Sequence, residues 1–276
     1  MTYWNAVLLG LVQGVAEFLP ISSSGHLAVL QNFLAIGDME NHMLFDVLLH
    51  LGTLAAVILA FWKDVREVVT EFARMLHIRR TPRGLRPNRR ERRLISFLII
   101  ATLPLIPAVF LSNVVESLYQ NTFFIGFTFI LTGFLLFAAD RMGHGNKDER
   151  SSTTADALVV GLAQAAAVVP GLSRSGTTIS FGMLRGFERS FAVKFSFLLS
   201  IPAVLGANLV SLIKVFSTGV EWSYVPMYLV GVACAFVSGY FAIYFLRLVV
   251  QRGKFGGFCY YCWGAGLVTL LLSLIS

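Results

Sequence analysis

Long apolar runs separated by short polar segments occupy most of this 276-residue chain. Six of the runs approach the roughly 20 apolar residues with which a helix crosses the hydrocarbon core of a membrane. The pattern therefore predicts an all-α polytopic membrane protein with six transmembrane helices. The predicted spans lie near residues 45–62, 94–112, 123–140, 195–213, 225–246 and 257–275.

Two shorter apolar runs end in serine-rich segments. The first is slightly short for a span, stops at Pro20 and continues into a run rich in serine. Because irregular backbone survives in a membrane only where protein or water satisfies its polar groups, residues 3–35 are predicted to form a re-entrant helical hairpin. Residues 157–190 predict a second hairpin. Four extra spans are the alternative, since either arrangement returns the chain to the side that it left.

The two hairpins are copies of each other. When residues 6–26 are aligned with 157–177, an offset of 151, eight of 21 positions are identical. Each half then holds three spans and one hairpin, and this odd number of spans predicts an inverted repeat. The chain is predicted to be a single membrane domain, 1–276, divided into repeat 1 (1–140), a polar linker (141–156) and repeat 2 (157–276).

Composition and charge agree with this topology. The chain is 56% hydrophobic and 13% charged, which is too apolar for a soluble domain of this size. Its net charge is +7, but eleven of the 22 Lys and Arg residues lie between Lys63 and Arg93. A cytoplasmic loop 63–93 places nearly all other positive charges on the same side and both termini outside, as the positive-inside rule requires. The basic balance therefore gives no reason to expect nucleic acid as a partner.

The serine-rich segments carry groups suited to an anion site. Serine and glycine are good residues for the start of a half-helix, whose free N–H groups and positive dipole end bind phosphate. Arg174 adds a guanidinium that can hold two phosphate oxygens. Ordinary helix capping is the alternative for the serines and glycines. The residues concerned are Ser22, Ser23, Ser24 and Gly25 in the first copy, and Ser173, Ser175 and Gly176 in the second.

Ionisable side chains near the first break add chemistry. Gln13 and Glu17 lie one helical turn apart, and a carboxylate at membrane depth is functional by default where it faces a cavity. The alternative is that Glu17 reaches the interface or caps a neighbouring helix. His26 suits proton transfer or metal ligation, with a structural hydrogen bond as the alternative. Asp46 is expected to support the site or to pack between helices. Together these groups predict an anionic, phosphorylated lipid as ligand.

The two motifs resemble the signatures of the bacterial undecaprenyl pyrophosphate phosphatases, also called bacitracin-resistance proteins. The first is Gln13-x-x-x-Glu17 followed by Phe18 to His26, and the second runs from Pro170 to Ser180. The resemblance extends over the chain in length, span order and basic first loop. It implies hydrolysis of undecaprenyl pyrophosphate in the bacterial plasma (inner) membrane, which recycles the lipid carrier for cell-wall synthesis. The active site would open toward the outer side.

The resemblance also implies roles for particular residues. Glu17, Ser23, His26 and Arg174 match catalytic positions, and a divalent cation, Mg²⁺ or Ca²⁺, is expected on Glu17. The amide of Gln13 lowers the local negative charge, so a cage of two carboxylates at 13 and 17 is not expected. Ser23 and a metal-bound water both stay open as the nucleophile. The predicted substrate-binding residues are Gln13, Ser22, Ser24, Gly25, Ser173, Ser175, Gly176 and Thr178.

A polyprenyl-phosphate transporter or flippase is the alternative function, since hairpins that meet at the midplane are also typical of transporters. A non-catalytic scaffold is disfavoured by the acidic, basic and nucleophilic groups gathered at the breaks. The expected partners are a polyprenyl diphosphate lipid and the membrane, and a homodimer is left open.

Overall fold

Helices account for the regular structure of this protein. The computed structural model describes residues 1–34, 43–76, 88–218 and 222–274, and no strand occurs among them. The predicted all-α polytopic class is confirmed. In chain order the elements are α1 (Tyr3–Phe18), α2 (Ser23–Leu34), α3 (Met43–Ala60), α4 (Trp62–Met75), α5 (Arg89–Thr102), α6 (Leu105–Val109), α7 (Ser112–Tyr119), α8 (Thr122–Met142), α9 (Thr154–Ala166), α10 (Arg174–Leu184), α11 (Arg189–Thr218), η2 (Trp222–Tyr224), α12 (Val225–Gln251), η3 (Phe255–Gly257) and α13 (Phe258–Ser273).

Four helices of the described chain, α8, α11, α12 and α13, are long and apolar enough to cross a membrane. The pair α3 and α4 passes the same test together, although the two helices meet at 91°. The prediction of one continuous helix over 94–112 is wrong, because α5 ends at Thr102 and the short helices α6 and α7 follow. Pro104 and Pro107 lack the N–H groups that a continuous helix needs there.

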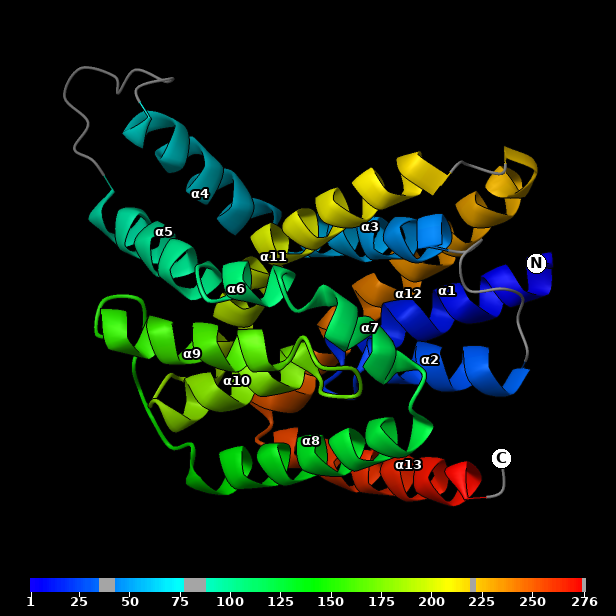
Figure 1. Ribbon diagram of the computed structural model, residues 1–276. Helices are drawn as coiled ribbons and strands as arrows, with labels where there is room; N and C mark the ends of the chain where they lie inside the picture. The colour runs from blue at the N-terminus through cyan, green and yellow to red at the C-terminus, as the bar shows by residue number, and fades with distance from the viewer. Residues whose placement is uncertain (35–42, 77–87, 219–221, 275–276) are drawn as a thin grey trace.

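Residues 63–75 were expected in a basic loop but form most of the amphipathic helix α4. Charged residues of this helix alternate with an apolar face that includes Val65, Val69 and Phe72. Because α4 leaves α3 at 91° and its Trp62 is exposed, it has the form of a helix lying in the membrane interface (Figure 1). His77 lies outside the described residues, as does His42 before α3.

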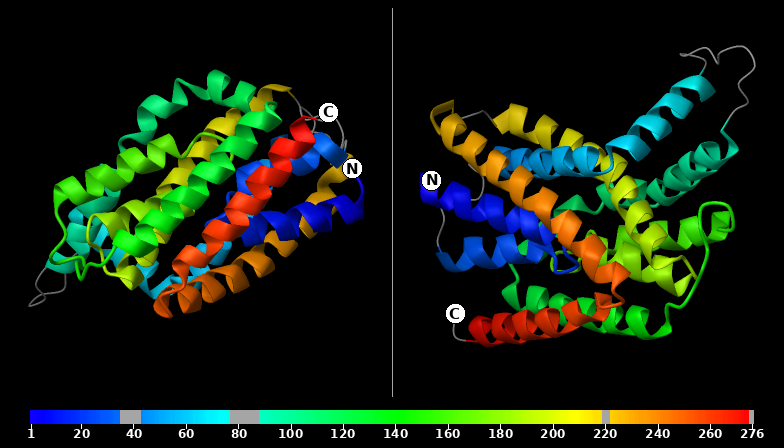
Figure 2. Two further views of the ribbon diagram at one scale, coloured as in Figure 1. Left: turned by 90° about the horizontal axis from the view of Figure 1, so that it is seen from below. Right: turned by 180° about the vertical axis from the view of Figure 1, so that it is seen from behind.

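The outer surface is apolar where spans face away from the protein. On α8 the exposed side chains Phe123, Phe127, Leu131 and Phe134 follow the spacing of one helix face. A water-soluble protein rarely exposes such a stripe, whereas a helix in lipid requires one. Helices α8 and α13 pack side by side in both views of Figure 2.

The two hairpins enter the molecule from opposite ends (Figure 1). Helix α1 starts at the end where α13 finishes, and it stops at Phe18 in the middle of the molecule. Helix α9 starts at the opposite end, beside the linker, and stops at Ala166. Helices α2 and α10 then return toward the ends from which α1 and α9 came. The two breaks therefore lie between the ends of the molecule.

Two aligned glycines make equivalent contacts in the two halves. A Cβ atom on Gly10 of α1 would lie 2.3 Å from the carbonyl oxygen of Gly231 in α12. A Cβ atom on Gly161 of α9 would lie 2.6 Å from the carbonyl oxygen of Ala101 in α5. Since α5 and α12 each belong to the second predicted span of their halves, the repeat in the sequence has a counterpart in the packing.

The linker end of the molecule is held by buried and half-buried ion pairs. Asp156 at the start of α9 lies 2.9 Å from both Lys147 Nζ and an Arg185 guanidinium nitrogen. Burial alone would raise the pKa of Asp156, but hydrogen bonds from Lys147, Thr153 and Arg185 outweigh it and lower the pKa to about 2. Thr153 and Asp156 also cap each other at the start of α9.

Candidate functional site

The breaks of the two hairpins touch each other. A Cβ atom on Gly25 would lie 2.9 Å from the Cα atom of Gly171, and one on Gly176 would lie 3.2 Å from the Cβ atom of Pro20. Pro20 and Gly171 are aligned positions in the repeat, as are Gly25 and Gly176. Each half-helix therefore begins against the break of the other hairpin, as the predicted meeting of the two tips requires.

Both half-helices are capped in the same way. The Ser22 hydroxyl accepts a hydrogen bond from the Gly25 N–H at 3.3 Å, and the Ser173 hydroxyl accepts one from the Gly176 N–H at 3.1 Å. In each copy the capping hydroxyl also lies 3.3 Å from the hydroxyl of the serine two residues later. The predicted helix starts at the serine motifs are thus confirmed. Ser22 has a φ of 68°, a left-handed conformation that is costly for a residue with a side chain.

The buried Glu17 carboxylate joins three helices. Its Oε2 atom accepts hydrogen bonds from Ser23 Oγ of α2 at 2.5 Å and from Gln13 Nε2 of α1 at 3.1 Å. Its Oε1 atom accepts a hydrogen bond from the Arg174 guanidinium of α10. Four predicted site residues therefore meet at one carboxylate, although they come from both hairpins. Glu17 is paired rather than left as an isolated charge, as a buried carboxylate requires.

Helix α3 brings a second acidic group to the same region. His50 Nε2 lies 3.9 Å from Glu17 Oε2, and its Nδ1 atom lies 2.8 Å from the carbonyl oxygen of Asp46. The Asp46 carboxyl interacts electrostatically with His50 and is hydrogen-bonded to Gln31. The imidazole of His50 therefore interacts electrostatically with both carboxylates, which gives the predicted support by Asp46 a spatial basis.

His26 faces the last span rather than Glu17. Its Nδ1 atom lies 2.7 Å from the Ser22 carbonyl oxygen, and its Nε2 atom lies 2.7 Å from the Tyr261 hydroxyl. The ring stacks on Tyr261 at 17° and meets the edge of Phe129. Because a carbonyl only accepts, Nδ1 carries the hydrogen and Nε2 of the neutral ring accepts from Tyr261. These contacts fix both the tautomer and the orientation of the ring.

Thr178 and Ser175 use their hydroxyls for packing between helices. Thr178 Oγ1 lies 2.5 Å from Ser196 Oγ of α11 and donates to the Arg174 carbonyl at 2.9 Å. Ser175 Oγ donates to the Leu19 carbonyl at 3.3 Å, across the two hairpins. The predicted substrate-binding residues thus lie near one another, while the Thr178 hydroxyl is directed at α11.

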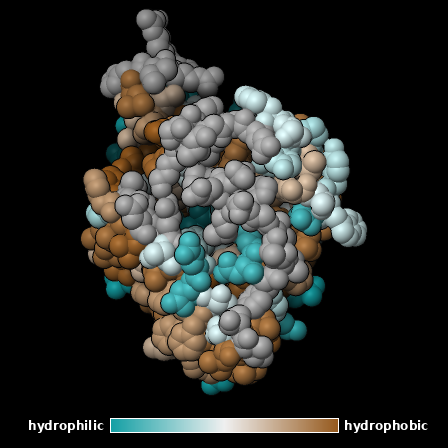
Figure 3. Space-filling view, turned by 45° about the vertical axis from the view of Figure 1, so that its right-hand side comes forward, coloured by the Kyte–Doolittle hydropathy of each residue, from teal (hydrophilic) through white to brown (hydrophobic). Residues whose placement is uncertain are grey.

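Two tyrosines join this region without having been predicted from the sequence. Tyr261 contacts His26, and Tyr119 of α7 is hydrogen-bonded to Ser24 and lies within electrostatic range of Glu17 and Asp46. Tyr261 lies in the last predicted span, where a tyrosine usually suggests a lipid-facing or interfacial position, and Tyr119 lies between two predicted spans. Neither position indicated a contact with the site. Figure 3 shows hydrophilic side chains gathered amid apolar surface on the side nearest the termini.

The donor groups suit a hydrated divalent cation better than a closed protein cage. The described part of the chain has no group of three or more His, Cys, Asp or Glu side chains that could hold a metal. However, Gln13 Oε1 and Asp46 Oδ1 are buried without a hydrogen-bond partner. Mg²⁺ and Ca²⁺ prefer such oxygen atoms, and Mg²⁺ commonly binds through one or two carboxylates, waters and substrate phosphates.

Comparison with known proteins gives a match over nearly the whole chain. A family model described as bacitracin resistance protein BacA matches residues 6–268. The undecaprenyl-diphosphatase of Alkaliphilus metalliredigens is 41% identical over the full length of both chains. That of Halothermothrix orenii is 37% identical over 99% of each chain. That of Methanobrevibacter smithii is 39% identical over 98% of this chain and 97% of the relative.

Proposed function

Because the chain belongs to the BacA family of bacitracin resistance proteins, we propose that it is a membrane phosphatase that hydrolyses undecaprenyl pyrophosphate to undecaprenyl phosphate and inorganic phosphate. This reaction returns the lipid carrier to cell-wall synthesis and confers bacitracin resistance. The observation that carries the proposal is the meeting of Glu17, Ser23 and Arg174 where the two half-helices begin.

The diphosphate binds between the two half-helix starts. Each start presents free N–H groups and the positive end of a helix dipole, which favour anionic oxygens. The Arg174 guanidinium has five N–H donors, so it can hold phosphate oxygens while it stays beside Glu17. Binding the transferring phosphoryl group in this way stabilises the charge that develops on it during hydrolysis.

Ser23 is the nucleophile that the geometry favours. Its hydroxyl donates to Glu17 Oε2 at 2.5 Å, so the carboxylate can take the proton as Ser23 Oγ attacks the terminal phosphorus. The bond to the bridging oxygen breaks, and undecaprenyl phosphate leaves with its electron pair. Water then attacks the phosphoserine and loses a proton to His26. Glu17 returns its proton to the serine oxygen, and inorganic phosphate leaves.

A divalent cation completes the proposed site. Glu17, with the unpartnered oxygens of Asp46 and Gln13, would hold Mg²⁺ or Ca²⁺. When bound, the cation supplies positive charge against the phosphate oxygens of the substrate. The carboxylate of Asp46 supports this charge balance in a chain that has an amide, Gln13, one helical turn before Glu17.

The proposed location is the bacterial inner membrane, with both termini and the opening of the site on the outer side. The support is the positive charge at the opposite end: Arg89 and Arg90 at the start of α5, and Lys147 and Arg185 near the linker. Segment 63–93 is then cytoplasmic. A homodimer stays a prediction from the sequence.

Phosphate release by the purified protein in detergent tests the proposed function. A polyprenyl diphosphate is the substrate, and a chelator such as EDTA is the second condition. We expect steady release of inorganic phosphate that EDTA stops and added Mg²⁺ or Ca²⁺ restores. A transporter on the same scaffold would release none, because detergent leaves it neither a gradient nor a second leaflet. Absence of release with correctly folded protein would contradict the phosphatase.

A further inference from the structure

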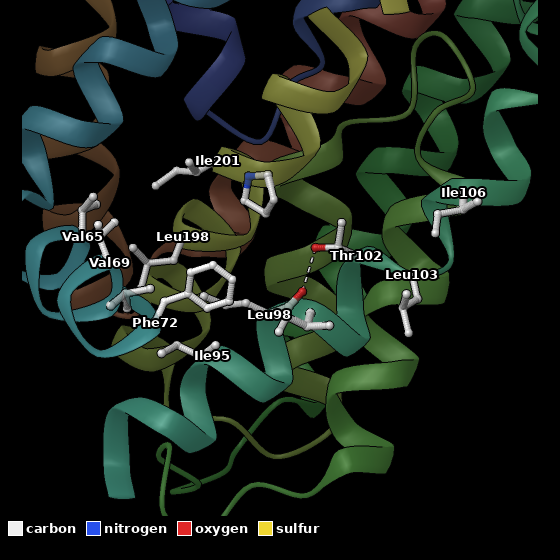
Figure 4. Close-up of a pocket in the computed structure, with 13 residues that line it drawn as sticks. Val65, Val69, Phe72, Ile95, Leu98, Thr102, Leu103, Ile106, Leu198 and Ile201 are labelled. Carbon is white, nitrogen blue, oxygen red and sulfur yellow. Dashed lines mark hydrogen bonds between the residues drawn. The ribbon is translucent and has the colours of Figure 1, made fainter. Parts of the chain in front are cut away.

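An apolar groove of about 320 Å³ lies between α4, α5 and α11, with Ile106 of α6 at one edge (Figure 4). Its walls are aliphatic and aromatic apart from Thr102, whose hydroxyl donates to the Leu98 carbonyl at 2.7 Å within its own helix. Val69 and Ile99, on opposite walls, are both about half exposed. The groove therefore has no free polar group for a water-soluble ligand, and its side is open to the membrane.

Local breaks in the helices hold the groove open. Helix α4 turns away from α3 by 91°, and α5 ends where Pro104 prevents its continuation. Leu198, Ile201 and Pro202 form the α11 wall. Ser196, on another part of α11, contacts Thr178 near the proposed active site. The groove and the active site are thus served by different faces of α11.

Positive charge lies at one end of this groove. Glu71 accepts hydrogen bonds from Arg92 Nε at 2.7 Å and from an Arg74 guanidinium nitrogen at 3.2 Å. Glu71 lies one turn beyond Val68 on α4, and Arg92 lies one turn before Ile95 on α5, so the ion pairs continue the groove face of both helices. Two guanidinium groups share one carboxylate, which leaves one positive charge and several N–H donors unused.

We propose that the groove binds one anionic phospholipid from the leaflet into which α4 is set. An acyl chain fills the apolar groove, and the head-group phosphate binds the unused N–H donors of Arg74 and Arg92. The groove matches the acyl chain and the arginines match the head group. An apolar cavity alone would accept any alkyl chain, but the positive charge at its end selects a negative head group. The proposal is independent of the phosphatase activity.

Native mass spectrometry of the delipidated protein in detergent tests the assignment. Phosphatidylglycerol and phosphatidylcholine of the same acyl length are titrated separately. We expect the wild type to retain one phosphatidylglycerol at about one tenth of the concentration needed for phosphatidylcholine. Ile99→Trp, which fills the groove from a half-exposed position, should abolish this retention. Arg74→Gln, which leaves the Arg92–Glu71 pair intact, should remove the preference for phosphatidylglycerol but keep chain binding.

Leu131→Trp on α8 is the matched control, because Leu131 is similarly exposed but lies far from the groove in the sequence and on another helix. It should bind phosphatidylglycerol like the wild type, and phosphate release in detergent should stay within about twofold in all three variants. Equal binding of the two lipids by the wild type, or unchanged binding by Ile99→Trp, would overturn the proposal. Displacement of phosphatidylglycerol by polyprenyl phosphate at lower concentration would overturn the choice of occupant.

Discussion

Arg174 donates a hydrogen bond to Glu17, although the two residues are 157 positions apart in the chain. Arg174 aligns with Ser23 in the repeat, and Ser23 donates to the other oxygen of the same carboxylate. Two equivalent positions of the repeat therefore bind the two sides of Glu17. This places the chemical differences between the two copies at a single point, where a serine comes from one half and a guanidinium from the other.

The hydrogen bond from Ser23 to Glu17 predicts a phosphoserine intermediate. Rapid quenching of the wild type with a polyprenyl diphosphate labelled in its terminal phosphate should trap label on the protein. Ser23→Ala should form no labelled protein and should lose at least about 100-fold in the rate of phosphate release, since the nucleophile and its proton acceptor act as a unit. Ser24→Ala, which removes a neighbouring hydroxyl, is the control and should still be labelled. Hydrolysis by Ser23→Ala at near wild-type rate would favour a water nucleophile instead.

The contact of Tyr261 with His26 predicts a loss of activity from the last span. Tyr261→Phe keeps the ring that stacks on His26 but removes the hydroxyl at Nε2. We expect kcat to fall by about tenfold with little change in KM, and the pH profile of kcat to move, because the imidazole loses one of its two orienting partners. Tyr260→Phe is matched to it, since Tyr260 is the adjacent tyrosine and is mostly exposed. Equal kinetics and pH profiles for the two variants would show that the Tyr261 hydroxyl does not orient His26 for catalysis.

The close packing of α1 on α12 predicts that a single added methyl group lowers the stability of the fold. In Gly10→Ala the added Cβ atom would lie 2.3 Å from a backbone oxygen of Gly231, so the helices must separate. The expected cost is about 1–3 kcal/mol, seen as a lower midpoint of thermal unfolding in detergent. Gly264→Ala is the control, because no atom lies within 4 Å of its added Cβ. A midpoint for Gly10→Ala as high as that of Gly264→Ala would contradict the packing.

The low pKa of Asp156 predicts a pH-dependent stability. An ordinary aspartate titrates near pH 4, whereas hydrogen bonds from Lys147, Thr153 and Arg185 outweigh burial and hold this pKa at about 2. The ionised form is thus favoured by folding, and its contribution, on the order of 2 kcal/mol, is complete above about pH 4 and is lost as the pH falls toward 2. Asp156→Asn should therefore unfold at a lower temperature than wild type at pH 7.

The difference in unfolding temperature between the wild type and Asp156→Asn should shrink below pH 4 and vanish near pH 2. Thermal unfolding of both proteins in the same detergent, followed by circular dichroism at several pH values, measures it. A difference that stays constant down to pH 2 would show that the charge of Asp156 does not stabilise the fold.

Much of this arrangement could be predicted from the sequence because it depends on local patterns. Apolar runs predicted the spans, and the repeated serine motifs predicted two capped half-helices. The spacing of Gln13 and Glu17 placed both on one helix face. The bent helix pair and the break after Thr102 were missed, because the apolar run over 94–112 is continuous even though Pro104 and Pro107 interrupt its helix.

The contacts of individual site residues depend on packing between distant helices. His26 was expected among the groups around Glu17, but its ring is held by Tyr261 from a segment 235 positions away. Tyr119 likewise reaches Ser24 from the end of α7, about 95 positions along the chain. No local spacing in the sequence encodes such pairs.

The rate of phosphate release by Arg174→Ala tests the central claim most directly, because Arg174 is the positive group that the second half contributes beside Glu17. It is compared in detergent with the wild type and with Arg174→Lys, using a polyprenyl diphosphate and Mg²⁺. We predict a loss of at least about 100-fold for Arg174→Ala and partial recovery in Arg174→Lys, which keeps the charge but not the planar set of donors. Release by folded Arg174→Ala at a rate near that of the wild type would contradict a phosphate site built from both halves.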